Sequence, residues 1–340
     1  MTAPVHPPIV VGIDADPSCR VALAWAADDA QRRHLPLHLV FAWREPANRR
    51  APGPTRLPGI QQTDDPLSAA ERTLREAVAF VRHRHSQVAV STLLAAGAPV
   101  PVLRRQARTA AAVVLGSRRL GRREGPFGAG SVALSVVAHG NCPVVMVRDR
   151  EFIGRQPPFF VVGVNVGWDG RRHSAAAVIH AFEEAARRGA ALRLLYIWRP
   201  PLLGVLDERT AVRECRRLLS DMVAGWRITY PDVEVHHAVL LGHPAALLAE
   251  ESVHALALIV GSHGHGLTGL LRGSVVSRAV RHAQCSVIAV PRLGVHRQTH
   301  GGPGISWLSH GVRAAVGRYA RPLASFTVRR PRRHGPDDDG

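Results

Sequence analysis

The 340-residue sequence contains no lysine, few aromatic residues and no apolar run long enough to span a bilayer. All 44 basic residues are therefore arginine, and the formal net charge is +18. Aromatic residues make up 5% of the chain, too few for a surface on which nucleic-acid bases stack. Because a spanning segment and an N-terminal signal pattern are both lacking, we expect a cytoplasmic protein without a membrane partner.

Cysteine is also scarce, and its spacing excludes a disulfide framework. The four cysteines, Cys19, Cys142, Cys215 and Cys285, stand far apart without a paired motif. We expect reduced thiols and no metal site built on them.

The charge has two interpretations. A GC-rich genome would encode arginine rather than lysine at basic positions, and the many alanines and prolines are consistent with GC-rich codons. Alternatively, the positive electrostatic field that this net charge produces would attract polyanions. The arginines are spread over predicted helices, which favours the first interpretation and does not favour nucleic acid as a partner.

What is present is a repeated succession of landmarks. Each half contains a strand, an alanine-rich helix, a strand ending in Trp, a Gly-Pro turn that opens a helix, a Gly-Ser loop and a last strand. The first half places them at 9–13, 20–33, 37–43, 96–99, 116–131 and 141–147, and the second at 160–164, 171–188, 192–198, 241–244, 261–274 and 284–290. Gly97 to Gly242 and Gly116 to Gly261 are both 145 positions apart, which indicates a tandem duplication.

The succession predicts the fold class. Continuous apolar strands that alternate with helices are typical of parallel sheets covered on both faces. We therefore expect an α/β protein of two tandem doubly wound, five-stranded parallel-sheet domains related to the Rossmann class. The expected divisions are 1–150 and 151–295, with the boundary near 149–158, followed by a basic disordered tail at 296–340. The proline-containing segment 44–66 is expected to form a mobile loop over the first site.

The Gly-rich segment 260–266, followed by Gly273 and Ser274, is the strongest candidate site. It lies between an apolar run and a helical pattern, so backbone N–H groups and a helix N-terminus would face an anion. A less complete copy of this pattern occupies residues 115–119 and is followed by Gly130 and Ser131.

Both halves resemble the universal stress protein family in its tandem form, over roughly residues 7–148 and 159–292. Nucleotide-binding members carry an Asp after the first strand and a loop of Gly, two residues, Gly, nine residues, then Gly-Ser or Gly-Thr. The resemblance implies ATP binding, with or without Mg²⁺, and a stress response through protein partners not identified by the sequence. The matched positions are Asp14, Ala42, Gly116, Gly130 and Ser131 in the first half, and Asn165, Ile197, Gly261, Gly264, Gly273 and Ser274 in the second.

Neither half carries the whole motif. Arg119 stands where the second glycine belongs, and ten residues separate it from Gly130. The second half keeps Gly261 and Gly264, but eight residues precede Gly273, and Asn165 replaces the acid. His263 is a further candidate, either as a donor to phosphate or as a solvated side chain. With His265 it lacks a third ligand for a metal.

The sequence shows no complete Walker loop, nucleophile elbow or paired carboxylates. We therefore expect a binding protein with at most slow ATP hydrolysis. Two other functions stay open: an interaction module with degenerate sites, and a polyanion binder that uses arginine and the tail. The halves are expected to pair through their last strands, as family dimers do, and a homodimer stays open.

Overall fold

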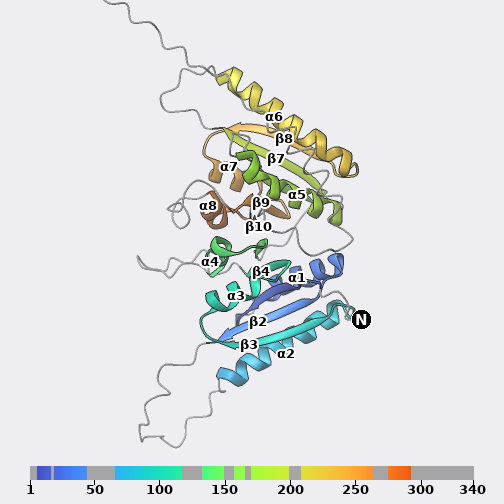
Figure 1. Cartoon of the computed structure of the whole chain (residues 1–340), viewed down its shortest axis with the longest axis vertical. Helices are drawn as coiled ribbons and strands as arrows, with labels where there is room; N and C mark the ends of the chain where they lie inside the picture. Colours follow the sequence, from blue (N-terminus) through green and yellow to red (C-terminus); the bar gives the residue numbers. More distant parts are fainter. Residues whose placement is uncertain are drawn as a thin grey trace, which may run out of the picture. The chain divides into compact units, whose positions relative to one another are not determined.

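The computed structural model describes residues 6–16, 19–43, 66–116, 132–148, 157–164, 170–198, 208–262 and 275–291 (Figure 1). Most of the expected loop at 44–66, most of the boundary at 149–158 and the tail at 296–340 lie outside these ranges. The same is true of the Gly-Ser loops after Gly116 and Ser262.

In the described ranges, each half contains five strands that alternate with four helices, as the sequence predicted. The first half consists of β1 Ile9–Ile13, α1 Cys19–Arg33, β2 Leu37–Trp43, α2 Pro66–Arg84, β3 Val90–Ala96, α3 Pro99–Ala107, β4 Ala112–Gly116, α4 Val132–His139 and β5 Val144–Val147. The second consists of β6 Phe159–Val164, α5 Gly170–Arg188, β7 Ala191–Trp198, α6 Glu208–Thr229, β8 Val235–Leu241, α7 Pro244–Glu251, β9 Ala257–Gly261, α8 Val275–His282 and β10 Ser286–Val290.

All ten strands form one sheet in the order β3-β2-β1-β4-β5-β10-β9-β6-β7-β8. Each half therefore has the same internal order, and within each half all strand pairs are parallel. The predicted fold class is confirmed. The central contact is β5 with β10, which pair antiparallel with Val145 opposite Ile288. The halves are thus joined through their last strands, as expected.

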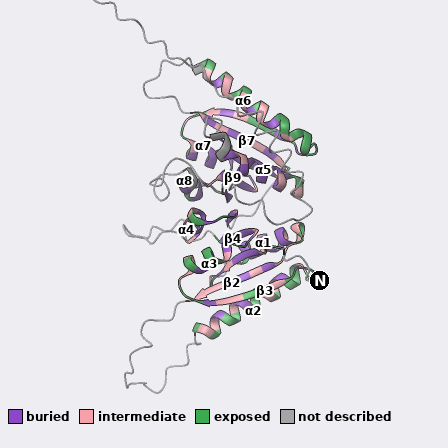
Figure 2. Cartoon of the chain, in the orientation of Figure 1, coloured by how far each residue is buried: buried purple, intermediate pink, exposed green. Residues whose placement is uncertain are grey.

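Helices cover both faces of the sheet, which accounts for the apolar strands. In β1, Ile9, Val11 and Ile13 belong to the core beneath α1, α2, α5 and α6, while Val10 faces the core beneath α3, α4, α7 and α8. Figure 2 shows buried residues concentrated in the central strands, with exposed residues on the outer sides of α2 and α6. The outermost strands β3 and β8 are mostly intermediate or exposed. Both cores continue across the β5–β10 contact, so the two halves share them.

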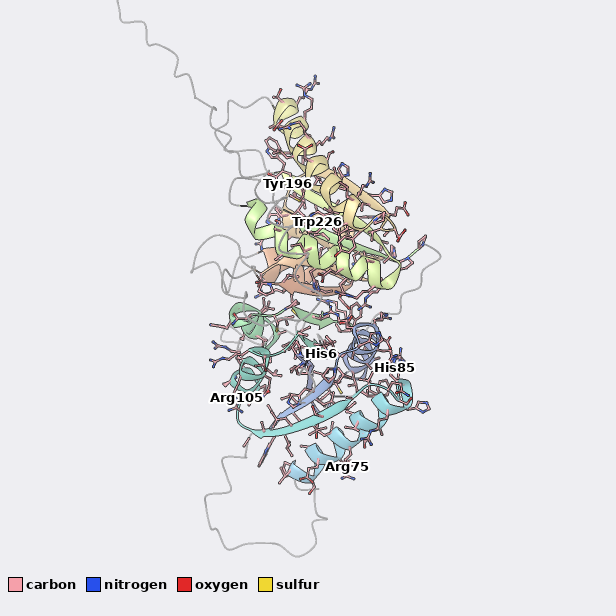
Figure 3. The ribbon with its side chains drawn as sticks, turned by 45° about the vertical axis from the view of Figure 1, so that its right-hand side comes forward. His6, Arg75, His85, Arg105, Tyr196 and Trp226 are labelled. Atoms are coloured by element: carbon pink, nitrogen blue, oxygen red, sulfur yellow. The ribbon has the colours of Figure 1, made fainter. Side chains whose placement is uncertain are left out.

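The aromatic residues that the chain does have are concentrated in the second half. The rings of Phe182 in α5 and Trp226 in α6 stack with centroids 5.8 Å apart, and Tyr230 packs on Phe182 at 5.6 Å. Figure 3 labels Trp226 in the second half. This contact fixes α6 on α5 beside the outer strands.

Glycines with unusual backbone angles mark corresponding turns. Gly97 and Gly242 have φ angles of +133° and +143°, and each comes two residues before the proline that opens α3 or α7. Proline suits the first turn of a helix because the N–H groups of that turn have no carbonyl partner within the helix, so the lack of an N–H costs no hydrogen bond. The duplication thus extends to backbone conformation.

The four cysteines are free thiols, and Cys142 and Cys285 are buried. Within the described residues, no helix is long and apolar enough to cross a membrane. No group of three His, Cys, Asp or Glu residues there is arranged to hold a metal ion.

Candidate nucleotide site

The strand order reverses at β1 in the first half, because β2 lies on one side of it and β4 on the other. Asp14 directly follows β1, Ala42 is the penultimate residue of β2 and Gly116 is the last residue of β4. Since the three strands are parallel, these positions lie at one edge of the sheet. Open α/β sheets bind ligands at this reversal point, outside the carboxyl ends of the strands.

Asp14 is exposed at this edge, and its carboxylate organises the turn that follows β1. The backbone N–H of Asp16 donates to Asp14 Oδ1 over 3.0 Å, which forms an Asx turn. One carboxylate oxygen thus shapes the turn while the side chain stays exposed to solvent. Asp14 therefore combines the role of a turn residue with that of a candidate ligand residue.

Cys19 is a neighbour of Asp14 that sequence reasoning missed. Burial raises the pKa of its thiol, and the carboxylate of Asp14 raises it further. The group is therefore a neutral thiol at pH 7 and a weak nucleophile. A cysteine at the start of a helix that follows an acidic turn was the available sequence signal.

Gly116 ends β4 with open space beside it. A Cβ built on this residue would meet no described atom within 4 Å, and the residue is exposed. Gly12, by contrast, is tightly packed, because a Cβ there would lie 2.5 Å from Leu115 Cδ2. The glycine in β1 serves packing beneath the edge, whereas none of the described residues crowds Gly116.

The second half repeats this edge with β6 between β7 and β9. Ile197 lies near the end of β7, and Gly261 is the last residue of β9. The N–H of Ser262, the residue after Gly261, donates to the carbonyl of Val290 over 2.8 Å, which anchors the start of the Gly-rich loop to β10. The candidates Gly130, Ser131, Asn165, His263, Gly264, Gly273 and Ser274 lie outside the described residues.

Two further residues of the second half come together at this edge. Nη1 of Arg278 on α8 lies 2.8 Å from Nε2 of His243, the residue before α7. Since guanidinium nitrogens only donate, the imidazole nitrogen accepts this bond. Sequence reasoning missed the pair, because its members are 35 positions apart and α7 and α8 meet only in the fold.

The duplicated order of elements and the two matching sheet edges have a counterpart in a known family. The sequence profile of the Universal stress protein family matches twice, over residues 7–148 and 163–291. The chain belongs to the universal stress protein family. The resemblance inferred from the motifs is confirmed, as is the tandem form.

Two universal stress proteins of Mycobacterium tuberculosis are similar over most of their length. Rv2005c is 34% identical over 292 residues, which cover 84% of this chain and 96% of the relative. Rv2623 is 33% identical over 295 residues, with 82% and 95% covered. A crystal structure of a universal stress protein from Archaeoglobus fulgidus matches with a TM-score of 0.57 at 15% identity, covering 84% of this chain and 96% of that one. The low identity means that this match supports the universal stress protein fold alone.

Proposed function

We propose that this universal stress protein binds an adenine nucleotide, ATP with or without Mg²⁺, and acts in the stress response through contacts with a regulatory partner. The nucleotide would lie at the carboxyl edge of the sheet in residues 1–150 and 151–295. The observation that carries the proposal is the placement of Asp14, Ala42 and Gly116 at adjacent strand ends around β1.

The roles of these residues follow from their chemistry. The exposed carboxylate of Asp14 would accept hydrogen bonds from ribose hydroxyls. The backbone near Ala42 and Ile197 would face the base. The open space beside Gly116 fits this assignment, because it leaves room for a phosphate close to the main chain. Backbone N–H groups, Ser131 and Ser274 would hold the phosphates at helix N-termini.

The second half is the stronger phosphate site. It keeps Gly261 and Gly264, and α8 begins at Val275, directly after Ser274. Arg278 lies one turn further along α8, where its guanidinium adds positive charge near the helix start. The matching position in the first half, 143 residues earlier, is Ser135, which carries no charge.

Calorimetry of the full chain with ATP and Mg²⁺ tests the proposal. We expect measurable binding that Gly264→Arg weakens at least about tenfold, since a bulky side chain would obstruct the approach of phosphate to the backbone. His83→Arg, on the exposed side of α2, adds a comparable charge elsewhere and should leave binding unchanged. Absence of heat in the intact protein, together with no effect of Gly264→Arg, would refute nucleotide binding.

An interaction module without nucleotide is the alternative, and the eroded motifs favour it. Arg119 replaces a motif glycine in one half, and Asn165 replaces the acid in the other. Mass spectrometry of the supernatant after denaturing the purified protein separates the two functions. A stoichiometric adenine nucleotide supports the main proposal, and its absence in protein that also fails to bind added ATP supports the alternative.

A further inference from the structure

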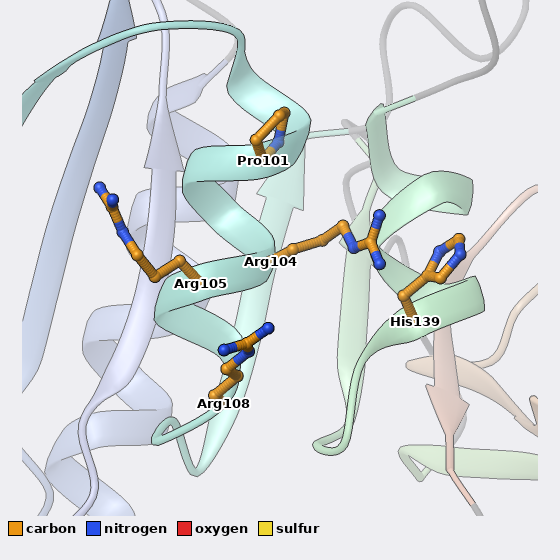
Figure 4. A pocket seen from close by; sticks show the side chains of 5 residues that line it. All are labelled: Pro101, Arg104, Arg105, Arg108 and His139. Atoms are coloured by element: carbon orange, nitrogen blue, oxygen red, sulfur yellow. The ribbon is translucent and has the colours of Figure 1, made fainter.

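A cationic hollow of about 270 Å³ lies between α3 and α4 (Figure 4). Its lining residues are Pro101, Arg104, Arg105, Arg108 and His139. Arg104 extends from α3 toward His139 on α4, and Arg105 lies on the other side of α3 (Figure 4). All four basic side chains line the hollow, and the guanidinium of Arg105 points away from those of Arg104 and Arg108.

The positive charge of this hollow is not neutralised by the described part of the protein. Arg104, Arg105 and Arg108 are exposed, and none of them forms an ion pair or side-chain hydrogen bond with a described residue. The arginines at the end of α5 differ, because Arg187 and Arg188 each pair with Glu184. Among the described lining residues there is no carboxylate. The hollow therefore offers unused donors to an anion from solution.

The duplication shows that this charge is not required by the fold. The positions 145 residues after Arg104, Arg105 and Arg108 hold Ala249, Glu250 and Val253. The same helix pair, α7 and α8, packs in the second half without them. Basic residues in the last turn of a helix can stabilise its negative end. The corresponding helix α7 has no basic residue in its last turn, so this stabilisation is not needed for the fold.

The hollow is separate from the candidate nucleotide site. The first turn of α3 follows the carboxyl end of β3, whereas Arg104 and Arg105 lie in its last turn, shortly before β4 begins at Ala112. The basic residues are therefore at the opposite edge of the sheet from Asp14 and Gly116.

We propose that this hollow binds linked phosphate groups, either inorganic polyphosphate or the phosphate chain of a nucleotide. Arg108 is the residue that follows α3, and its backbone keeps the helical conformation, so its side chain leaves the same side as that of Arg104, one turn earlier. Guanidinium groups bind phosphate oxygens in a bidentate manner, and two of them in a row suit two linked phosphates. His139 lines the same hollow from α4, but its Nδ1–H already donates to the carbonyl of Ser135 over 3.1 Å, so the donors for phosphate are the guanidinium groups.

Calorimetry of the full chain with tripolyphosphate, at fixed ionic strength, tests this site. Replacing two cations with R104Q/R108Q should weaken binding at least about tenfold. The control R75Q/R82Q removes the same charge from exposed positions on α2 and should change binding less than about twofold. Circular dichroism establishes that the variants fold, and Arg108→Gln alone gives an intermediate effect if the double variant is unstable.

Further measurements distinguish a nucleotide from inorganic polyphosphate as the ligand. They also distinguish binding in this hollow from binding at the candidate nucleotide site. Competition by ATP against tripolyphosphate in a Gly264→Arg background assigns the hollow to nucleotide phosphates, and lack of competition assigns it to inorganic polyphosphate. Equal weakening by R75Q/R82Q would overturn the proposal, because the ligand would then respond only to overall charge. Loss of tripolyphosphate binding in Gly264→Arg but not in R104Q/R108Q would overturn it too, as would tighter binding of a DNA duplex that depends on Arg104.

Discussion

Arg33 of α1 and Glu184 of α5 form an ion pair that connects the two halves of the chain. The duplication has placed an acidic residue and an arginine at corresponding positions of α1 and α5. Arg33 also binds Asp29 in its own helix over 3.0 Å, and Arg188 binds Glu184 and Asp29, each over 3.1 Å. Asp29 and Glu184 are 155 positions apart, as are Arg33 and Arg188. The result is a closed ring of two carboxylates and two guanidiniums with near two-fold symmetry.

The ring is buried, and its surroundings differ between the halves. Asp29 is 3% exposed and Glu184 1%. The guanidinium of Arg188 stacks over Trp25 at 4.4 Å, whereas the position that corresponds to Trp25 is His180. Burial alone would raise the pKa of Glu184, but Arg33 and the other nearby cations hold it well below its ordinary value. The carboxylate is therefore charged at neutral pH.

Glu184→Gln should destabilise the protein by about 3 to 5 kcal/mol, because it removes a buried carboxylate that pairs with three partly buried arginines. Urea unfolding, followed by circular dichroism, measures the change. Glu214→Gln on α6 breaks an exposed pair with Arg217 and is the matched control, for which we expect a much smaller effect. Equal effects of the two substitutions would show that the ring does not hold the halves together.

His180 should make stability fall as the pH decreases. Burial lowers its pKa to about 4 from the ordinary 6.5, and the groups that face it are Glu184, Arg33, Arg187 and Arg188. The unfolded chain takes up the proton at the higher pH, so stability is full above about pH 6.5 and is lost progressively toward pH 4. The total loss is about 3 kcal/mol.

Urea unfolding at a series of pH values from 7 to 4 checks this expectation. His180→Gln removes the titrating group and should flatten the profile over that interval. If the variant and the parent lost stability in parallel, the loss would come from other groups.

The ends of α1 and α5 offer a paired test of backbone strain. His34 follows α1 with φ +52°, and Gly189 follows α5 with φ +58°. The N–H groups of Leu35 and Ala190 donate to the carbonyls of Ala30 and Ala185, each over 3.0 Å, so both ends form the same Schellman turn. Since only glycine adopts this φ without strain, His34→Gly should stabilise the protein and Gly189→His should destabilise it, each by about 1 kcal/mol. Thermal unfolding measures both, and changes of the same sign would contradict the argument.

Close packing beneath the first site predicts that Gly12→Ala destabilises the protein by about 1 to 3 kcal/mol. The added Cβ would lie 2.5 Å from Leu115 Cδ2. Leu115→Val removes that atom, so the double variant Gly12→Ala, Leu115→Val should lose less than the sum of the single losses. Strict additivity in urea unfolding would show that the two residues do not compete for the same space.

Asp14→Asn distinguishes the role of Asp14 in the turn after β1 from its proposed role in binding the nucleotide. The amide keeps an oxygen that accepts from the N–H of Asp16, so stability should change by less than about 0.5 kcal/mol. Loss of the charge should weaken nucleotide binding in the first half about tenfold, because a charged acceptor binds hydroxyls more strongly. Calorimetry with ATP checks the second expectation, and an unchanged affinity would remove Asp14 from the site.

The sequence by itself determined the elements, their order and the duplication. Strands Ile9–Ile13 and Leu37–Trp43 have the predicted bounds, and the pairing of the last strands was expected. These features depend on apolar runs, local periodicity and turn residues, which are properties of neighbouring positions. The placement of Asp14, Ala42 and Gly116 at one edge followed from the same pattern, because parallel strands end together.

Only the tertiary structure decided which distant side chains meet. The ring of Asp29, Arg33, Glu184 and Arg188 depends on α1 and α5 lying on the same face of a shared sheet. The cationic hollow depends on where the end of α3 meets α4, and the pair of His243 and Arg278 on how α7 meets α8. Local patterns record which face of an element is apolar. The partners of its long charged side chains are set by helix packing between residues far apart in the chain.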